Sequence, residues 1–266
     1  MSQFIIVCLI ILLVAVTMTM VGKGGGNFYV LILVMAGIPM HQAAATGQFI
    51  LFTAALAALL IFQKNKVVAW PLAIYIGTLT ATSALAGGYF SHLFSGFSLK
   101  IIFAGLLAIA GAMMLVPVSD KTSLHGNRKF GYWSFNLGND IHIVNSWIAI
   151  PVTILTGFGS GMVGVSGGSF LVPLMVLACR VPMHVAVGTA STLIAAIALM
   201  GFAGHAIQGD FNPSWAIPLA ILTVIGGFIG GKFAMKTKPK HLKQLFAYTT
   251  WAASIVMVIN AFYSNF

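Results

Sequence analysis

The sequence predicts an all-α polytopic membrane protein built from two inverted repeats. Hydrophobic residues make up 59% of the 266 residues and charged residues only 6%, whereas a soluble surface needs far more charge. The two halves match each other in sequence, and each interrupts its apolar segments with a glycine-rich turn. We therefore expect each repeat to contain a glycine-broken half-helix hairpin plus three longer transmembrane helices.

The apolar segments predict the helices in chain order. They cover 4–21, 27–37, 42–62, 67–90 and 100–118 in the first half, and 147–163, 169–179, 185–204, 213–235 and 242–263 in the second. A full span needs about 20 residues, so the second segment of each half has only half-membrane length. We expect three parts: a first membrane repeat over 1–118, a polar cytoplasmic linker over 119–145 and a second membrane repeat over 146–266.

The internal repeat extends beyond the glycines. Ile38–Ala43 matches Val181–Ala186, and Gly87–Phe90 matches Gly230–Phe233. A repeat of this length indicates that the two halves share one architecture.

Loop charges predict how the halves are oriented. Lys and Arg gather in the loops 63–66 and 236–243, while the counterparts 205–212 and 91–98 contain neither. If positive loops lie in the cytoplasm, one structural position faces opposite sides in the two halves. This pattern predicts an inverted repeat, with both termini outside, in a multi-pass protein of the cell inner membrane.

The paired glycine turns are the candidate binding site. They are Gly22–Phe28 and Gly164–Phe170, and we expect half-helices to begin at Gly26-Asn27 and Gly168-Ser169 with Asn27 and Ser169 as N-caps. The first N–H groups of a helix lack intrahelical acceptors and attract anions. The predicted backbone ligands of a small anion are Gly24, Gly25, Gly26, Asn27, Ser166, Gly167, Gly168 and Ser169. Alternatively, the glycines only allow tight helix packing.

Several polar side chains near the turns have two interpretations. Lys23 is an anion ligand or gate, or it lies near the interface and extends to water. His41 and His184, which are repeat mates, carry protons for coupling, or they cap the following helix. A third group completes the polar pocket, or its Thr and Ser hydroxyls only bond the preceding turn. Its members are Thr46, Gln48, Thr189 and Ser191.

Other site classes lack support in the sequence. No metal-ligand spacing, P-loop or dinucleotide fingerprint occurs, so we expect neither a metal nor a cofactor. The only carboxylates are Asp120, Asp140 and Asp210, and the net charge of +10 belongs to loops and an anion path rather than to nucleic-acid binding. The expected partners are a small anion and the lipid bilayer, and the sequence leaves monomer and homodimer open.

At these residues the chain resembles the TauE/SafE family of sulfite exporters, within the toluene sulfonate uptake permease superfamily. The second half carries the family's pattern at Gly164, Gly167, Gly168, Phe170, Val172, Pro173, Pro182, Ala186, Gly188, Thr189 and Ser191. The first half departs from it at Leu31 and at Ala45-Thr46-Gly47-Gln48, and Lys23 is not expected from the family. The resemblance implies an inner-membrane transporter of sulfur-containing anions such as sulfite or organosulfonates.

Together, these features predict a secondary transporter, a probable exporter, that works by alternating access around a site between the two turns. It is not expected to be an enzyme. One alternative is a passive anion channel on the same architecture. A less favoured alternative is an intramembrane serine protease with Ser166 as nucleophile and His205 as base, but the first-half turn has Gly24 in place of that serine.

Overall fold

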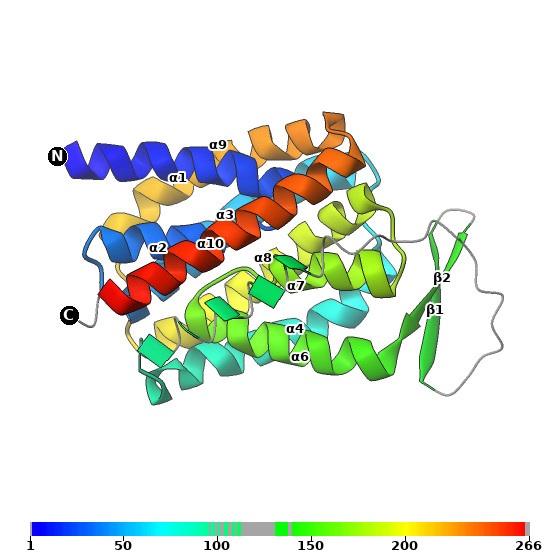
Figure 1. Ribbon diagram of the computed structural model, residues 1–266, viewed down its shortest axis with the longest axis horizontal. Coiled ribbons are helices and arrows are strands. Elements are labelled where there is room, and N and C mark those ends of the chain that lie inside the picture. The colour runs from blue at the N-terminus through cyan, green and yellow to red at the C-terminus, as the bar shows by residue number, and fades with distance from the viewer. Residues whose placement is uncertain are drawn as a thin grey trace.

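The computed structural model describes residues 2–95, 97–98, 101, 104–105, 108–109, 111–112, 131–137 and 140–263. Within these residues the chain is mostly helical, as predicted (Figure 1). The helices of the first half are α1 (Ser2–Met20), α2 (Gly26–Met35), α3 (Met40–Lys64), α4 (Trp70–Phe90) and the short η1 (Ser91–Leu93). Those of the second half are α6 (Ser146–Val163), α7 (Gly168–Pro173), η2 (Leu174–Ala178), α8 (Met183–Ile207), α9 (Pro213–Lys236) and α10 (Pro239–Tyr263). Most of the predicted segment 100–118 lies outside the described residues.

A two-stranded hairpin precedes the second half, which the sequence did not predict. Strands β1 (Tyr132–Leu137) and β2 (Asp140–Asn145) pair antiparallel, with Tyr132 opposite Asn145. Trp133 stacks between Tyr75 of α4 and Phe135, with ring centroids 4.8 Å and 5.3 Å apart. The hairpin is therefore attached to the membrane-embedded part by aromatic packing. The remainder of the predicted linker, 119–130 together with 138–139, lies outside the described residues.

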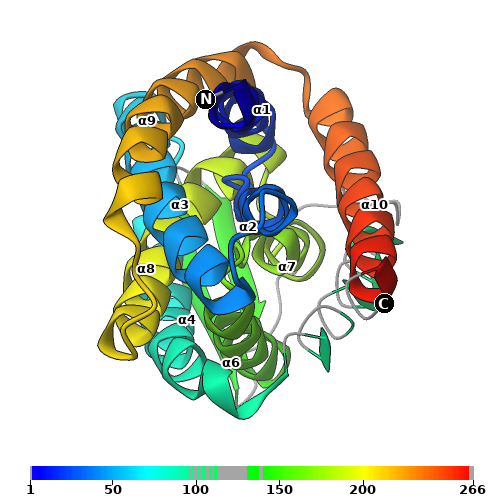
Figure 2. The same cartoon turned by 90° about the vertical axis from the view of Figure 1, so that its left-hand side faces the viewer.

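In the view of Figure 2, the short helices α2 and α7 both lie in the middle of the molecule. A curved wall of α1, α9, α3, α8, α4 and α6 flanks them on one side, and α10 stands on the other. The helices of the wall pack in equivalent pairs. The contact between α3 and α9 corresponds to the contact between α8 and α4. The contact between α1 and α9 corresponds in the same way to the contact between α6 and α4.

The repeat mates α3 and α8 run in opposite directions along each other. Near the start of α8, Gly188 packs on the Val67 carbonyl just beyond the end of α3. Near its other end, Gly201 packs on the amide of Gln48, in the first part of α3. The corresponding helices α3 and α8 therefore point to opposite ends of the molecule.

The same arrangement separates the loops by charge. At one end, His184 Nε2 lies 2.9 Å from the carbonyl oxygen of Thr237 in the basic loop after α9, and Gly231 packs on Ile61 close to the basic loop after α3. At the other end, the two loops without Lys or Arg meet where His92 Nε2 contacts Asp210 Oδ2 at 2.9 Å.

Four helices in the described part of the chain are long and apolar enough to cross a membrane: α3, α6, α8 and α9. The outer surface of the wall is apolar as well, for example at Leu13, Ile74 and Leu155, whose exposed fractions are 65%, 63% and 70%. A soluble monomer rarely exposes so much apolar surface, whereas lipid accepts it. The chain is therefore a helical membrane protein.

Candidate functional site

The two glycine turns meet in the centre of the molecule, where α2 begins at Gly26 and α7 begins at Gly168. A Cβ on Gly26 would lie 2.8 Å from the Ser166 nitrogen, and one on Gly168 would overlap the Gly22 carbonyl oxygen. Only glycine allows the two backbones to approach this closely. The repeat mates Gly26 and Gly168 therefore bring the two helix starts together.

The amide N–H groups at these turns lack acceptors. In the first turn, Lys23 N donates to Met18 O at 3.0 Å, and the next bonded amide is Phe28 N, which donates to Gly25 O at 2.9 Å. In the second, Val165 N donates to Ser160 O at 3.0 Å, and the next is Phe170 N. Within the described residues, the N–H groups of 24–27 and 166–169 have no hydrogen-bond acceptor. Buried backbone donors are rarely left in this state.

The predicted N-caps are wrong. Gly25 and Gly167 occupy the N-cap positions of α2 and α7, and neither provides a side-chain bond to the helix start. Asn27 and Ser169 lie two residues further on and hydrogen-bond to each other, Nδ2 donating to Oγ at 3.0 Å. A cap requires non-helical backbone, and the chain enters α2 through Gly25 at φ 93°, which disfavours a side chain there.

Several buried oxygens near the turns also lack partners among the described residues: Asn27 Oδ1, Tyr29 Oη, Thr46 Oγ1, Gln48 Oε1 and Ser166 Oγ. Tyr29 was not a sequence prediction, although its hydroxyl lies against Gly25, 2.8 Å from where a Cβ would stand. Buried polar atoms without partners call for an explanation, and a bound ligand or water is the usual one. For Tyr29, the only sequence signal was a hydroxyl group inside an apolar segment.

The remaining pocket candidates have protein partners. Gln48 Nε2 donates to Ser160 O at 2.9 Å, and the hydroxyl of Thr189 accepts from Ala69 N at 2.9 Å. Ser191 Oγ donates to Val187 O at 3.2 Å, the bond to the preceding turn that is common in membrane helices. Thr46 and Gln48 therefore keep free acceptor atoms, while the Thr189 hydroxyl is bonded to the first half and the Ser191 hydroxyl to its own helix.

Lys23 is buried, with an exposed fraction of 1%, and points to α10. Its ammonium donates to Phe246 O at 2.6 Å, to Thr249 Oγ1 at 2.9 Å and to the hydroxyl of Thr250, and it lies 4.1 Å from the centroid of the Phe246 ring. All of these partners are neutral. The side chain therefore attaches the first glycine turn to α10 instead of extending to water.

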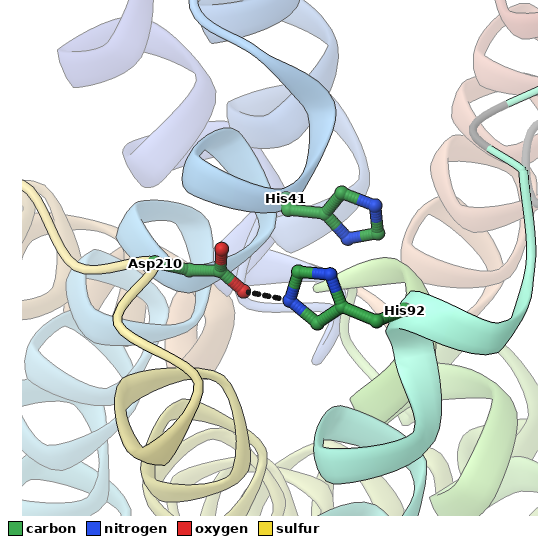
Figure 3. A group of neighbouring side chains, drawn as sticks. All are labelled: His41, His92 and Asp210. Carbon is green, nitrogen blue, oxygen red and sulfur yellow. Dashed lines mark hydrogen bonds and ion pairs between the residues drawn. The ribbon is translucent and has the colours of Figure 1, made fainter.

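The two predicted histidines lie at opposite ends of the molecule. Pro39 and Pro182 hold the N-cap positions of α3 and α8, so the capping interpretation of His41 and His184 is wrong. His41 stacks on His92, with ring centroids 4.2 Å apart and planes at 14° (Figure 3).

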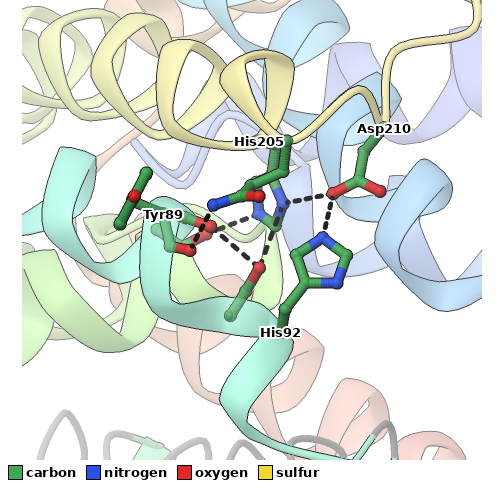
Figure 4. Close-up of polar contacts among 8 residues, drawn as sticks. Tyr89, His92, His205 and Asp210 are labelled. Carbon is green, nitrogen blue, oxygen red and sulfur yellow. Dashed lines mark hydrogen bonds and ion pairs between the residues drawn. The ribbon is translucent and has the colours of Figure 1, made fainter.

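Sequence reasoning missed a polar cluster around His41. It consists of His92 from η1, Asp210 from the loop after α8, and the fully buried His205 from the last turn of α8 (Figure 4). Burial acts to raise the pKa of the Asp210 carboxyl, but hydrogen bonds from His205 and His92 and their positive charge outweigh it and lower that pKa below its ordinary value. The available signal was an aspartate beside a membrane helix in a chain with three carboxylates.

The cluster does not have the geometry of a ligand set for one metal ion. Donor atoms of His41, His92 and Asp210 lie within 4.8 Å of one another. A metal ion must lie in the plane of each imidazole that binds it, and two stacked, nearly parallel rings share no plane. The arrangement is suited to holding protons instead.

The geometry also argues against a serine protease. Ser166 Oγ has no hydrogen-bond partner among the described residues, and His205 directs Nε2 to Gly161 O at 2.9 Å. A nucleophilic serine requires a base within hydrogen-bond reach.

Comparisons with known proteins agree with the fold. The chain is 25% identical to the probable membrane transporter protein YunE of Bacillus subtilis over 91% of this chain and 93% of that protein. It is 24% identical to a probable membrane transporter protein of Xylella fastidiosa (88% and 87% covered) and 22% identical to MJ0441 of Methanocaldococcus jannaschii (93% and 92% covered). No solved structure matches. The profile of the family "Sulfite exporter TauE/SafE" matches residues 7–257, and the chain therefore belongs to this family of membrane transporters.

Proposed function

We propose that this protein is a secondary transporter, working as an exporter, of small sulfur-containing anions such as sulfite or organosulfonates. The substrate binds where the two glycine turns meet, in a multi-pass protein of the cell inner membrane. Family membership supports transport, and the family's description names sulfite. The observation that carries the site is that two groups of backbone N–H donors without acceptors among the described residues, 24–27 and 166–169, lie in buried turns that pack against each other.

The chemistry of that region suits an anion. Each N–H group carries a partial positive charge, and the dipoles of α2 and of the continuous helix Gly168–Ala178 add to it. The Lys23 side chain lies beside the first turn and contacts no carboxylate among the described residues. A sulfite ion offers three acceptor oxygens, so it can satisfy several donors at once and partly repay the cost of burying its charge.

The arrangement of the helices supports alternating access. The repeat mates α3 and α8 run antiparallel, and equivalent pairs pack in both halves, as expected of an inverted repeat. The π-helical segment η2 follows Pro173, which lacks an N–H group, and interrupts the regular helix beside the turn. One half rocking against the other would expose the two turns to either side in succession.

A matched pair of variants tests the site. Gly167 has φ −66°, which proline adopts without strain, so Gly167→Pro removes one N–H donor while Gly167→Ala adds a Cβ and keeps it. A hydrogen bond to a charged group contributes about 1.5–3 kcal/mol. Purified protein carrying Gly167→Pro should therefore bind sulfite roughly 10- to 150-fold more weakly than Gly167→Ala in a thermal-shift or calorimetric titration. Equal affinities would remove this amide from the site.

Transport kinetics distinguish the proposed carrier from the alternative of a passive anion channel. In proteoliposomes, a carrier saturates with sulfite concentration and shows counterflow of labelled sulfite against unlabelled sulfite. A channel on the same architecture shows neither behaviour, so linear flux without counterflow would replace the carrier mechanism.

A further inference from the structure

We propose that His205, Asp210 and Ser91 form the binding site of the proton that drives this transporter. This inference rests on the proposed transport function and names its coupling ion. The three residues come from the end of α8, the loop after it and η1 after α4, so the site joins the two halves of the molecule at one end (Figure 4).

One ring nitrogen of His205 has a fixed role. Nε2 lies 2.9 Å from the carbonyl oxygen of Gly161 on α6, and a carbonyl oxygen only accepts. Nε2 therefore carries a hydrogen in every state of the site. The other ring nitrogen, Nδ1, therefore determines whether the site holds a proton. Its role is assigned from the groups that lie beside it.

Two neighbours lie near Nδ1: Asp210 Oδ2 at 3.5 Å and Ser91 Oγ at 3.4 Å. With a proton bound, Nδ1–H donates to the Asp210 carboxylate, and the imidazolium and carboxylate neutralise each other. The Ser91 hydroxyl then donates to Gly88 O, as its distance of 2.8 Å indicates. All three groups are satisfied in this state.

Without the proton, the same residues remain satisfied. The Ser91 hydroxyl turns to donate to Nδ1, while Gly88 O keeps the backbone N–H of Ser91 as its donor. Asp210 Oδ2 keeps the bond to His92 Nε2 at 2.9 Å. A buried polar group without a partner is costly, so a site whose groups are paired in both states can gain and lose a proton reversibly.

The groups around His205 define its electrostatics. Within the described residues, α4 and α6 contribute only backbone carbonyls, the loop after α8 contributes Asp210, η1 contributes His92 and α3 contributes His41 behind it. Asp210 is the one carboxylate among them. Proton binding therefore neutralises a buried negative charge instead of adding to a positive one.

The stacked imidazoles connect this site to the exterior. The side chain of His92 is 42% exposed, at the end of the molecule whose loops lack Lys and Arg, and it contacts Asp210 and His41. On the side away from the exterior, His205 Nε2 donates to the carbonyl oxygen of Gly161. The carbonyl oxygen of the neighbouring Ser160 accepts from Gln48 Nε2. Residues 160 and 161 lead directly into the glycine turn at Gly164. The proton site therefore contacts α6, the helix that leads into the second glycine turn.

Coupling is tested by proton and sulfite flux in proteoliposomes containing a pH-sensitive dye. We expect sulfite movement to carry protons in the unaltered protein, and His205→Gln to retain sulfite counterflow while losing the proton flux. His142→Gln is the matched control and should keep both fluxes, because His142 lies in β2, where its Nδ1 contacts the carbonyl oxygen of Cys179, outside the helices that carry His205 and the glycine turns. Proton flux that survives His205→Gln unchanged would overturn the proposal.

A measurement without substrate keeps this test independent of the proposed function. Imidazole nitrogens of labelled histidine are followed by NMR in nanodiscs between about pH 5 and 9, with His205→Gln to assign the signals. We expect His205 Nδ1 to gain and lose a proton while Nε2 stays protonated. A single protonation state of His205 throughout would contradict the proposal, whereas sulfite neither binding nor moving while His205 titrates would contradict only the transport function.

Discussion

Asn27 and Ser169 occupy equivalent positions in the two repeats and hydrogen-bond to each other across the molecule. The Asn27 carbonyl oxygen keeps no partner among the described residues, and neither does the nearby hydroxyl of Ser166. At the scale of single residues, the site therefore consists of polar atoms that the protein buries without satisfying. Such atoms are rare in folded proteins and are informative about ligands.

Asn27→Asp should test whether this region accepts an anion. The new carboxylate has the shape of the amide but supplies a negative charge that the free N–H groups bind, so it takes the place of the substrate. We expect sulfite affinity in calorimetric titration to fall roughly 100-fold or more from like-charge repulsion in a dry site. Thermal stability should stay the same or rise. Asn65→Asp, in an exposed loop, is the control and should bind as the unaltered protein does; unchanged binding by Asn27→Asp would refute the site.

The variant Lys23→Met should show whether Lys23 supports sulfite binding through its charge or only packs the first turn against α10. Methionine fills a similar volume without the ammonium, and burying a charge among neutral partners is costly. We expect the melting temperature to be unchanged or higher while sulfite affinity falls by about tenfold or more, since the electrostatic support is lost. Lys64→Met, at the exposed end of α3, should change neither quantity. A Lys23→Met protein that melts earlier but binds normally would make Lys23 a purely structural link to α10.

At the scale of elements, hydropathy and the positions of the glycine-rich turns predicted the helix positions closely. The segments 147–163 and 213–235 became Ser146–Val163 and Pro213–Lys236, because lipid-buried backbone must form helix wherever the side chains are apolar. The N-caps were wrong because capping depends on a local φ angle, here that of Gly25. The contacts of Lys23 with α10 and of His205 with Asp210 and Gly161 join distant segments, and no local pattern encodes them.

Glycines away from the turns determine how the long helices pack, and Gly161 is the clearest case. A Cβ there would overlap the backbone of Ala84, so Gly161→Ala should force α6 away from α4. We expect a loss of about 1–3 kcal/mol, measured as a lower melting temperature in detergent. Gly105→Ala is the control: no described atom lies within 4 Å of the added methyl, and the residue is helical, so stability should be equal or slightly higher. Equal melting of both variants would mean that the α4–α6 contact is not tightly packed.

At the scale of the whole molecule, the antiparallel repeat mates and the separation of basic from non-basic loops describe one orientation in the membrane. The loops after α3 and α9 lie at one end, and η1 meets the loop after α8 at the other. The sequence predicted from charge alone that the two basic loops lie at the same end, because loops rich in Lys and Arg are retained on the cytoplasmic side during insertion.

Cysteine labelling should reveal that orientation. In a background with Cys8 and Cys179 replaced by alanine, Lys66→Cys and Lys238→Cys should react with a membrane-impermeant maleimide only from the cytoplasmic side. Ser95→Cys and Gly209→Cys should react only from the outside, and all four positions are exposed. Reaction of Lys66→Cys and Lys238→Cys from opposite sides would contradict the inverted arrangement.

The most direct measurement is a crystal structure of the protein with bound selenite, located by the anomalous signal of selenium. If the two turns form the anion site, the selenium peak lies where selenite oxygens can reach N–H groups from both 24–27 and 166–169, at about 2.7–3.2 Å. A peak elsewhere at saturating selenite, with those amides still without acceptors, would contradict the account.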